Sequence, residues 1–487
     1  MQAELGRDWR VSDLAAAVGV SNRTLQRQFQ TFLGETPGGA LRRLRFERAR
    51  RNLLQGEPHM KVMDVAERCG FPHFGRFSVE YRRRYGEAPS QTLRRQTRLW
   101  DALASTPMLV PPTRDRPMLA IPPIETDPEN ADIARDVAEE LATALTRAGV
   151  AVTSEARLAR YRLAGALRGT AAQSRLTFRL IEAESGRHLW AHRSDDVLSG
   201  DLTTEQRLAT RITAALQPCL RLAEIERAER KPDTEQSSQD LTLRAMPHVL
   251  SLDADGNARA LELLHRARDR DPSHPMATAL AAWAHAQRVI YHFSASAPEE
   301  RARSAELASK AMPLARDASA LAILGNTFTS LRDIGRAEQV VRRALAVDGG
   351  SAWAWSRSGW IDLYKGDSDS AIERFMIALE LAPHDSLAFN NLVGIGCAHF
   401  NAGRYVEAAR WQERALIEHP TAAWVHRTLC PAYVLAGAQP EAHRSLTALR
   451  EHYPELTVSL VQEGLPPLTE AYSELLVGAL QAVGLPS

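Results

Sequence analysis

One pattern of helix, sharp turn and helix occurs twice in the first hundred residues, and this duplication constrains the fold more than any other feature. The first copy reads SDLAAAVGVSNRTLQRQF over residues 12–29, and the second reads KVMDVAERCGFPHFGRFSVEY over residues 61–81. Gly19 of the first copy recurs as Gly70, 51 residues later. Because glycine adopts positive φ at little cost, both positions suit a sharp turn. We therefore predict two helix-turn-helix units.

The spacing of apolar residues separates an inner from an outer face in the first unit. Leu14 and Val18 are predicted to face inward on its first helix. Ser21 is predicted to cap the second helix, on which Leu25 and Phe29 point inward at i and i+4. Arginine and glutamine side chains on its outer face would suit the edges of guanine and adenine. That outer face carries Arg23, Gln26, Arg27 and Gln30.

The two units, their GETP and GEAP ends and the joining segment RLRFERARRNL resemble the DNA-binding domain of AraC-type transcription regulators over residues 8–97. The resemblance implies that each second helix lies in the major groove of DNA. It also implies that a connecting helix, expected over residues 39–54, sets the separation of the two. The base-reading positions that the family implies in the first unit are Arg23, Gln26 and Arg27. Those that it implies in the second unit are Phe74, Gly75, Arg76 and Val79.

The second unit departs from this family, which commonly has a polar or basic residue where Val79 stands. We expect this unit to contact phosphates through Arg76, Arg82 and Arg83, and a thymine methyl group through Val79 or Phe74. The alternative is that the arginines form only a solvated helix face. Two correctly spaced units with capping residues favour DNA binding.

The distribution of charge supports a basic domain joined to an acidic one. Residues 1–100 contain 19 Lys and Arg against 10 Asp and Glu, whereas the other 387 residues contain 41 against 49. A basic segment of this kind is typical of a nucleic-acid-binding domain. We place this domain at residues 1–100 and a proline-containing linker at residues 101–117.

Residues 118–229 are predicted to form a small α/β domain. The expected strands are 118–124, 151–153, 161–167, 174–182 and 188–194, and the expected helices are about 133–148 and 204–222. The segments LAIPPI, VAEELATALTR, LAGALRG and FRLIEAESGRHLWAHR resemble the TolB-like domain that accompanies helical repeats in regulators and in some adenylate cyclases. The resemblance covers residues 115–225.

No segment carries a motif of enzyme chemistry. The chain has no Walker glycine loop, no HExxH and no GxSxG, so we expect neither an enzyme nor a cofactor. His188 and His192 are four residues apart, but a metal site needs a further ligand, so none is expected. Four scattered cysteines without a CxxC pair indicate buried thiols, and no apolar run is long enough to span a membrane. We therefore expect a cytoplasmic protein.

Helical repeats are predicted for residues 240–487, after a polar linker at 230–240. Gly325 and Gly359 are 34 residues apart, as are Ala337 and Ala371. This period and the alanine and proline positions resemble tetratricopeptide repeats over about 240–457, in about six units. The resemblance implies a curved α-solenoid whose concave side binds peptides or protein partners.

Two tryptophans are candidates for the partner-binding face of the repeats. Trp353, Ser356 and Trp360 lie at i, i+3 and i+7, which predicts that they point towards the concave side. The alternative is that Trp353 and Trp360 pack against the preceding repeat. The sequence leaves both interpretations open.

The sequence as a whole predicts a multidomain and mostly α-helical protein: a double helix-turn-helix domain, a small α/β domain and an α-solenoid. We interpret it as a DNA-binding transcription regulator whose repeats sense or recruit a protein or peptide partner, or mediate a homodimer. The alternative is a tetratricopeptide scaffold or adaptor whose DNA-binding domain is secondary. The base-reading positions on the outward face still carry Arg23, Gln26 and Arg27, which favours the interpretation as a regulator.

Overall fold

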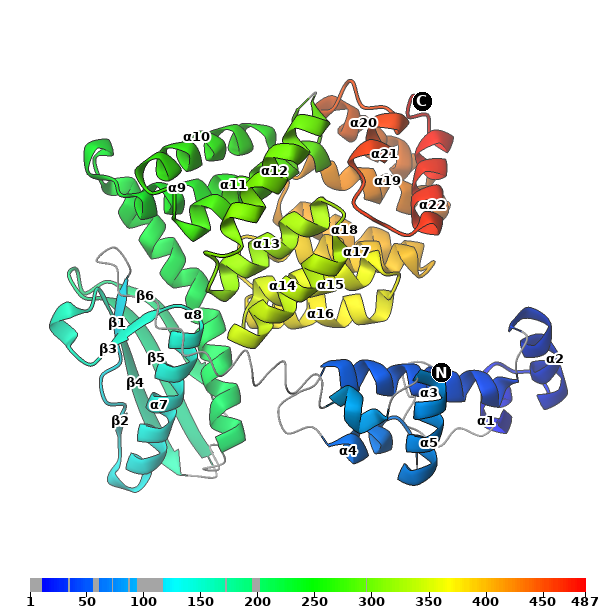
Figure 1. Ribbon diagram of the computed structural model, residues 1–487, viewed down its shortest axis with the longest axis horizontal. Helices are drawn as coiled ribbons and strands as arrows, with labels where there is room; N and C mark the ends of the chain where they lie inside the picture. The colour runs from blue at the N-terminus through cyan, green and yellow to red at the C-terminus, as the bar shows by residue number, and fades with distance from the viewer. Residues whose placement is uncertain are drawn as a thin grey trace. The chain divides into compact units, whose positions relative to one another are not determined.

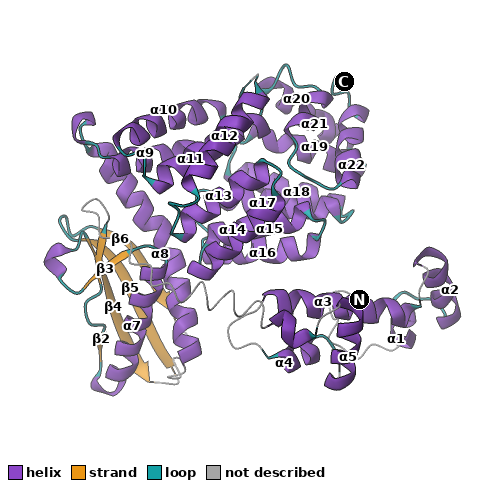
Figure 2. Ribbon diagram, in the orientation of Figure 1, coloured by secondary structure: helices purple, strands orange, loops and turns teal. Residues whose placement is uncertain are grey.

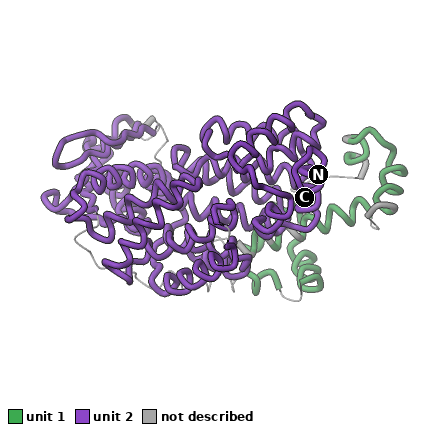
Figure 3. Tube along the Cα trace, turned by 90° about the horizontal axis from the view of Figure 1, so that it is seen from above, with its two compact units in different colours: residues 1–107 green, residues 108–487 purple. Residues whose placement is uncertain are grey.

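The computed structural model describes residues 11–33, 36–55, 61–71, 73–85, 88–93, 117–170, 173–194, 202–294 and 296–487. The chain divides into two compact units, residues 1–107 and residues 108–487, called the head and the body below (Figure 3). Helices dominate the described residues of both units, and a single small sheet lies in the described part of the body (Figures 1 and 2). The predicted fold class is confirmed.

Two helix pairs joined by a longer helix form the head. Both glycines predicted to make sharp turns have positive φ, 69° at Gly19 and 76° at Gly70. Thr36 Oγ1 accepts a hydrogen bond from the backbone N–H of Gly39 at 3.1 Å at the start of the connecting helix. The helices are α1 Val11–Ala17, α2 Asn22–Leu33, α3 Pro37–Gln55, α4 Val62–Arg68 and α5 Phe74–Tyr85.

The two helix pairs of the head have separate cores of unequal size. Leu14, Ala15 and Leu25 form the small core of the first pair. The second core is larger and aromatic, since Phe46 of α3 packs on Phe71 and on Phe77 at ring-centroid distances of 4.5 and 5.5 Å. The prediction that Val18 faces inward is wrong, because its side chain is 62% exposed beside the turn.

A twisted sheet with both parallel and antiparallel pairs begins the body. Its strands lie in the order β3-β1-β4-β5-β6, and β2 pairs with β4. Strands β1 and β3 and strands β1 and β4 are parallel, whereas β4–β5 and β5–β6 are antiparallel. The bounds are β1 Met118–Ala120, β2 Glu125–Thr126, β3 Ala151–Thr153, β4 Tyr161–Thr170, β5 Gln173–Glu182 and β6 His188–Ser194.

One face of this sheet is covered by two helices, α7 Ala131–Arg147 and α8 Leu202–Arg230. The alternation predicted for β5 is confirmed, because Leu176, Phe178 and Leu180 are all buried in this core. Strand β1 ends at Ala120, so the predicted strand 118–124 is too long; Pro122 and Pro123 follow after Ile121, and proline has no N–H for a ladder.

Helix α8 extends beyond the helix predicted for residues 204–222. Its first half packs in the sheet core through Leu208, Ile212 and Leu216, whereas Ile225 and Ala228 belong to the core of the repeats. A single helix therefore takes part in both cores (Figure 1). The linker predicted for residues 230–240 is wrong: this segment is a short ordered turn that ends in a capping box at the start of helix α9.

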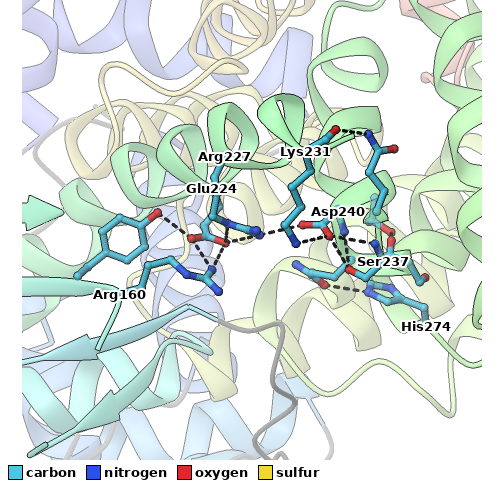
Figure 4. Close-up of polar contacts among 12 residues, drawn as sticks. Arg160, Glu224, Arg227, Lys231, Ser237, Asp240 and His274 are labelled. Atoms are coloured by element: carbon cyan, nitrogen blue, oxygen red, sulfur yellow. Dashed lines mark hydrogen bonds and ion pairs between the residues drawn. The ribbon is translucent and has the colours of Figure 1, made fainter. Parts of the chain in front are cut away.

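Buried charges hold this junction together (Figure 4). Glu224, with 3% of its side chain exposed, accepts hydrogen bonds from Arg160 at 2.6 Å and from the Tyr161 hydroxyl at 2.7 Å. Asp240, 1% exposed, accepts from Arg227 at 2.9 Å and from Lys231 at 2.7 Å. Glu224 also accepts from Arg227 at 3.1 Å, so each carboxylate is compensated by two cationic side chains, which is the condition under which a buried charge is tolerated.

Six successive helix pairs, α9 to α20, follow and form the repeats, and two further helices end the chain. The 34-residue spacing of glycines has a packing reason: a Cβ atom on Gly359 would lie 2.9 Å from the Phe375 ring, and one on Gly325 would lie 2.5 Å from Val341. The bounds are α9 Ser238–Leu250, α10 Ala254–Arg270, α11 Pro275–Ile290, α12 Ala297–Ala311, α13 Ala318–Ser330, α14 Ile334–Val347, α15 Ala352–Tyr364, α16 Ser368–Leu381, α17 Ala388–Asn401, α18 Tyr405–Glu418, α19 His426–Leu435, α20 Gln439–His452, α21 Val458–Gly464 and α22 Glu470–Ala482.

The substitution Asp240→Asn tests the junction. Burial alone would raise the pKa of this carboxyl, but hydrogen bonds from Lys231 and Ser237 and the charge of Arg227 lower it to about 2. Removing the charge takes the carboxylate away from Lys231 and leaves Arg227 paired with Glu224 alone, and we expect a loss of about 3 kcal/mol of unfolding free energy at pH 7. The measurement is scanning calorimetry of the full-length protein.

The effect of Asp240→Asn should depend on pH with a defined sign. Because the folded pKa is lowered, the wild-type advantage is present above about pH 4 and is lost as the pH falls towards 2. Asp233→Asn is the matched control, since that carboxylate bonds to Arg244 but is 68% exposed, and little change is expected. An equal loss in both variants would contradict the role given to Asp240.

Candidate nucleic-acid interface

Helix α2 presents the outward face that the sequence predicts. Leu25 is buried and Phe29 is half-buried, so these two residues fix which side of the helix faces the core. The hydroxyl of Ser21 accepts a hydrogen bond from the Thr24 backbone N–H at 3.1 Å, which confirms it as the cap. All four predicted base-contacting residues are exposed, namely Arg23, Gln26, Arg27 and Gln30.

Helix α5 is held in the core of the head by two buried aromatic side chains, and it exposes an apolar surface on its other side. Phe77 and Tyr81 are buried, and the Tyr81 hydroxyl lies within hydrogen-bond distance of Thr92 Oγ1 at 3.2 Å. On the opposite side Val79 is 74% exposed and Phe74 is 44% exposed, although both are large apolar residues. The three arginines assigned to phosphates, Arg76, Arg82 and Arg83, are exposed as well.

An ion pair between α3 and α5 was missed in the sequence. Arg42 Nε of α3 donates to the two carboxylate oxygens of Glu80 at 3.0 and 3.1 Å, and this hydrogen bond is the main reason why the pKa of Glu80 is lowered. Glu80 lies among the exposed arginines of α5. Its pairing with Arg42 neutralises a carboxylate that would otherwise repel phosphate.

The length of α3 suits two helices that enter neighbouring turns of a duplex. Its 19 residues span about 28 Å at 1.5 Å per residue, and one turn of DNA measures about 34 Å. The turn before α5 packs tightly on this helix, because a Cβ atom on Gly70 would lie 2.9 Å from the guanidinium carbon of Arg45. Helix α3 therefore fixes the second helix pair in place.

The chemistry of the two exposed faces differs. Helix α2 offers guanidinium and amide groups, which donate and accept in the patterns that base edges require. Helix α5 offers apolar side chains flanked by arginines, which suits phosphate contact and van der Waals contact with a methyl group.

The structure does not place the two candidate partner-binding tryptophans on an open face. Both are 8% exposed. Trp360 packs on Phe375 at 5.4 Å, so the prediction that it points outward is wrong, and it is a core residue. The helical period places a residue on a face but does not show which neighbours cover that face.

Trp353 has a structural role at the junction between α8 and the repeats. Its indole N–H donates to Asp385 at 2.9 Å, and the guanidinium of Arg221 from α8 lies 4.4 Å from its ring centroid. The prediction that Trp353 forms an exposed partner surface is therefore wrong. Its remaining edge lines a hollow of about 600 Å³ between the sheet domain and the repeats.

Neither a metal centre nor a membrane span is found in the parts of the chain that the structure describes. Within them no three His, Cys, Asp or Glu side chains are close enough to hold a metal ion. His188 is exposed, and the His192 ring stacks on Trp190 at 5.5 Å. The helices within these described ranges are too short or too polar to cross a bilayer.

Comparison with known proteins confirms the predicted helix-turn-helix domain. Residues 14–95 match a family model described as a helix-turn-helix domain. The protein named "Probable thc operon regulatory protein" of Rhodococcus erythropolis is 41% identical over 95 residues, which cover 19% of this chain and 29% of that protein.

Two further proteins are similar to this chain over longer stretches. A protein of Rhizobium meliloti (strain 1021) whose name describes an adenylate cyclase is 28% identical over 153 residues, or 31% of this chain and 26% of that protein. The chain thus spans less than a third of these two relatives. A tetratricopeptide repeat protein from Parabacteroides merdae ATCC 43184 is 15% identical, with a TM-score of 0.29 and coverage of 50% of this chain and 91% of that one.

The substitution Gly70→Ala tests how the second helix pair is built. Positive φ and the contact with Arg45 both oppose a side chain there, so we expect a loss of about 1–2 kcal/mol in urea unfolding of residues 1–107. Gly75→Ala is the control, because it lies in α5 with open space around it and should stabilise the helix by about 0.5–1 kcal/mol. Equal effects at both positions would show that the turn does not require glycine.

Proposed function

We propose that this protein is a transcription regulator that binds duplex DNA sequence-specifically through its head. The observation that carries the proposal is the exposed set of arginine and glutamine side chains on α2, held outward by the burial of Leu25. Similarity of the first hundred residues to an operon regulatory protein supports it.

The two helix pairs have different tasks in this proposal. Helix α2 reads bases through Arg23, Gln26 and Arg27, with Gln30 beside them. Helix α5 positions the head through Arg82 and Arg83, while Val79 supplies apolar contact. Base preference is therefore stronger under the first pair than under the second.

In this proposal the sheet domain and the repeats of the body respond together when a partner binds. Helix α8 belongs to the cores of both the sheet domain and the repeats, so an event in the repeats changes the sheet domain as well. Helical repeats commonly bind peptides or proteins, and we propose such a partner for this body. The domain limits 1–100, 118–229 and 240–487, the TolB-like character of the middle domain and a homodimer are parts of the same proposal.

No reaction is proposed for this chain. The similarity to a protein named as an adenylate cyclase covers 26% of that protein, so its activity is not carried over. A regulator of this type needs only binding sites, and the residues assigned here act by contact. We also propose that it works in the cytoplasm, where its DNA target lies.

The substitution Arg27→Ala tests the base-reading face. On a site selected from a random DNA pool, we expect the full-length variant to bind about 1–3 kcal/mol more weakly, because a bidentate contact to a base is lost. Its affinity for unrelated DNA should change much less. Fluorescence anisotropy measures both. The control is Arg259→Ala, which removes an exposed arginine of α10 in the body. If Arg27→Ala and Arg259→Ala bind the selected site equally well, the assignment of α2 is refuted.

The double substitution Arg82→Ala with Arg83→Ala tests the positioning role of α5. Loss of two phosphate contacts should weaken selected and random DNA alike, and should reduce the slope of log affinity against log salt by roughly 2. Anisotropy titrations at roughly 50 to 200 mM salt measure this slope, because the affinity for DNA falls strongly over this range. A loss confined to the selected site would assign base reading to these arginines instead.

A further inference from the structure

Arginines in the interior of the body are generally paired with carboxylates. A guanidinium taken out of water is costly unless a negative charge and hydrogen bonds compensate it. The body meets this requirement at several places in both its sheet domain and its repeats. These pairs are Arg160–Glu224, Arg221–Asp385, Arg227–Asp240 and Arg374–Asp362.

Arg357 of α15 and Arg427 of α19 are buried without such a carboxylate. They are 6% and 9% exposed, and no described Asp or Glu lies within ion-pair distance of either. Arg427 donates only to backbone carbonyls, at 2.6 Å to Ile290 and at 3.4 Å to Trp424. Arg357 lies 5.9 Å from the Trp360 ring centroid, and no hydrogen bond joins its side chain to a described residue.

The guanidinium groups of Arg357 and Arg427 both influence Tyr291 electrostatically. Arg427 lies 5.7 Å from the ring centroid of Tyr291 at the end of α11. Burial raises the pKa of this phenol to about 12, and the charges of Arg427 and Arg357 both oppose that rise. Burial also lowers the pKa of Arg357 to about 10, which still leaves it charged at pH 7. Two positive charges are therefore concentrated around one tyrosine.

Unused hydrogen-bond donors surround these charges. The indole N–H groups of Trp360 and Trp424 are enclosed and have no partner among the described residues. Trp424 packs on Tyr291 at 5.0 Å, so its indole belongs to the same place. Buried donors in proteins nearly always have an acceptor. What the described residues lack here is a negative charge and an acceptor for the two indole N–H groups.

We propose that this buried arginine cluster, formed by Tyr291, Arg357, Trp360, Trp424 and Arg427, binds the carboxylate of a small organic acid with an apolar body. A carboxylate supplies both missing features, because it is anionic and accepts the parallel hydrogen bonds that a guanidinium donates. The aromatic rings of the cluster provide apolar walls of the kind that surround the body of small ligands.

The small size of the ligand follows from how the cluster is covered. Helix α22 packs against α19, the helix that carries Arg427, and its Tyr472 packs on Phe400 at 5.0 Å. The end of helix α21 also lies close to it, since a Cβ atom on Gly464 would be 2.5 Å from His292, the residue after Tyr291. A folded protein cannot reach side chains enclosed in this way. The site is thus separate from the partner surface proposed for the repeats, and its binding can be measured without DNA.

The experiment is a titration of the full-length protein with 4-fluorobenzoate, followed by ¹⁹F NMR. We expect saturable binding that Arg357→Met weakens at least about 30-fold, the effect of removing one side of a buried charge pair. Trp360→Phe keeps an aromatic ring but removes one N–H donor, and should weaken binding by a smaller factor. Arg374→Met is the matched control, because that arginine is already paired with Asp362, and its affinity should equal that of the wild type.

Thermal unfolding without ligand gives a second readout. Arg357→Met removes an uncompensated charge and should raise the melting temperature, whereas Arg374→Met breaks an ion pair and should lower it. Competition with succinate, inorganic phosphate and an acidic hexapeptide identifies the ligand class. If succinate or phosphate competes more strongly than unlabelled benzoate, the claim that the ligand has an apolar body is overturned. If only the peptide competes, the claim that the ligand is a small molecule is overturned. Unchanged binding in Arg357→Met, or no binding of any of these anions, overturns the site itself.

Discussion

The arrangement of the body depends on one helix shared by two hydrophobic cores. Helix α8 has 29 residues and spans about 43 Å at 1.5 Å per residue, long enough to pass from the sheet domain into the repeats. Leu216 and Leu220 are buried under the sheet, and Ile225 is buried against the first repeat. Between them lies Glu224, which ties Arg160 of the sheet domain to Arg227 of the helix. One continuous helix thus connects the sheet domain to the repeats.

Arginine serves different purposes in the head and in the body, and the cost of desolvation explains the difference. On α2 and α5 the guanidinium groups are exposed, so water compensates their charge until a phosphate or a base replaces it. In the body most interior arginines are paired with carboxylates at once, as Arg221 is with Asp385. Arg357 is buried without either form of compensation, and this contrast makes its surroundings a binding site rather than another structural pair.

Local features were predictable from the sequence. The turns at Gly19 and Gly70, the cap at Ser21 and the outward face of α2 follow from residue type and helical period alone. Strand β6 was predicted with its observed bounds, and the alternation of Leu176, Phe178 and Leu180 marked the buried face of β5. Each of these depends on neighbours within about one or two turns of chain.

Features set by distant residues were not predictable. Helix α8 was expected to end near residue 222 but continues to Arg230, and its Arg227 pairs with Asp240 at the far end of the presumed linker. Arg42 and Glu80 are 38 residues apart, so no periodic pattern connects them. One of two interpretations placed Trp353 on the open concave side because of its helix face, but the residues that cover it come from α8 and from Asp385. Burial of this kind is decided by tertiary packing.

The central claim is that the head reads DNA with two helices held apart by α3. A hydroxyl-radical footprint of the full-length protein, combined with methylation interference on a selected site, tests it most directly. The account predicts two major-groove contact regions on one face of the duplex, centred about 10–10.5 base pairs apart, with sharper base interference in one of them. One contact region, or two regions at a spacing that places them on opposite faces, would contradict it.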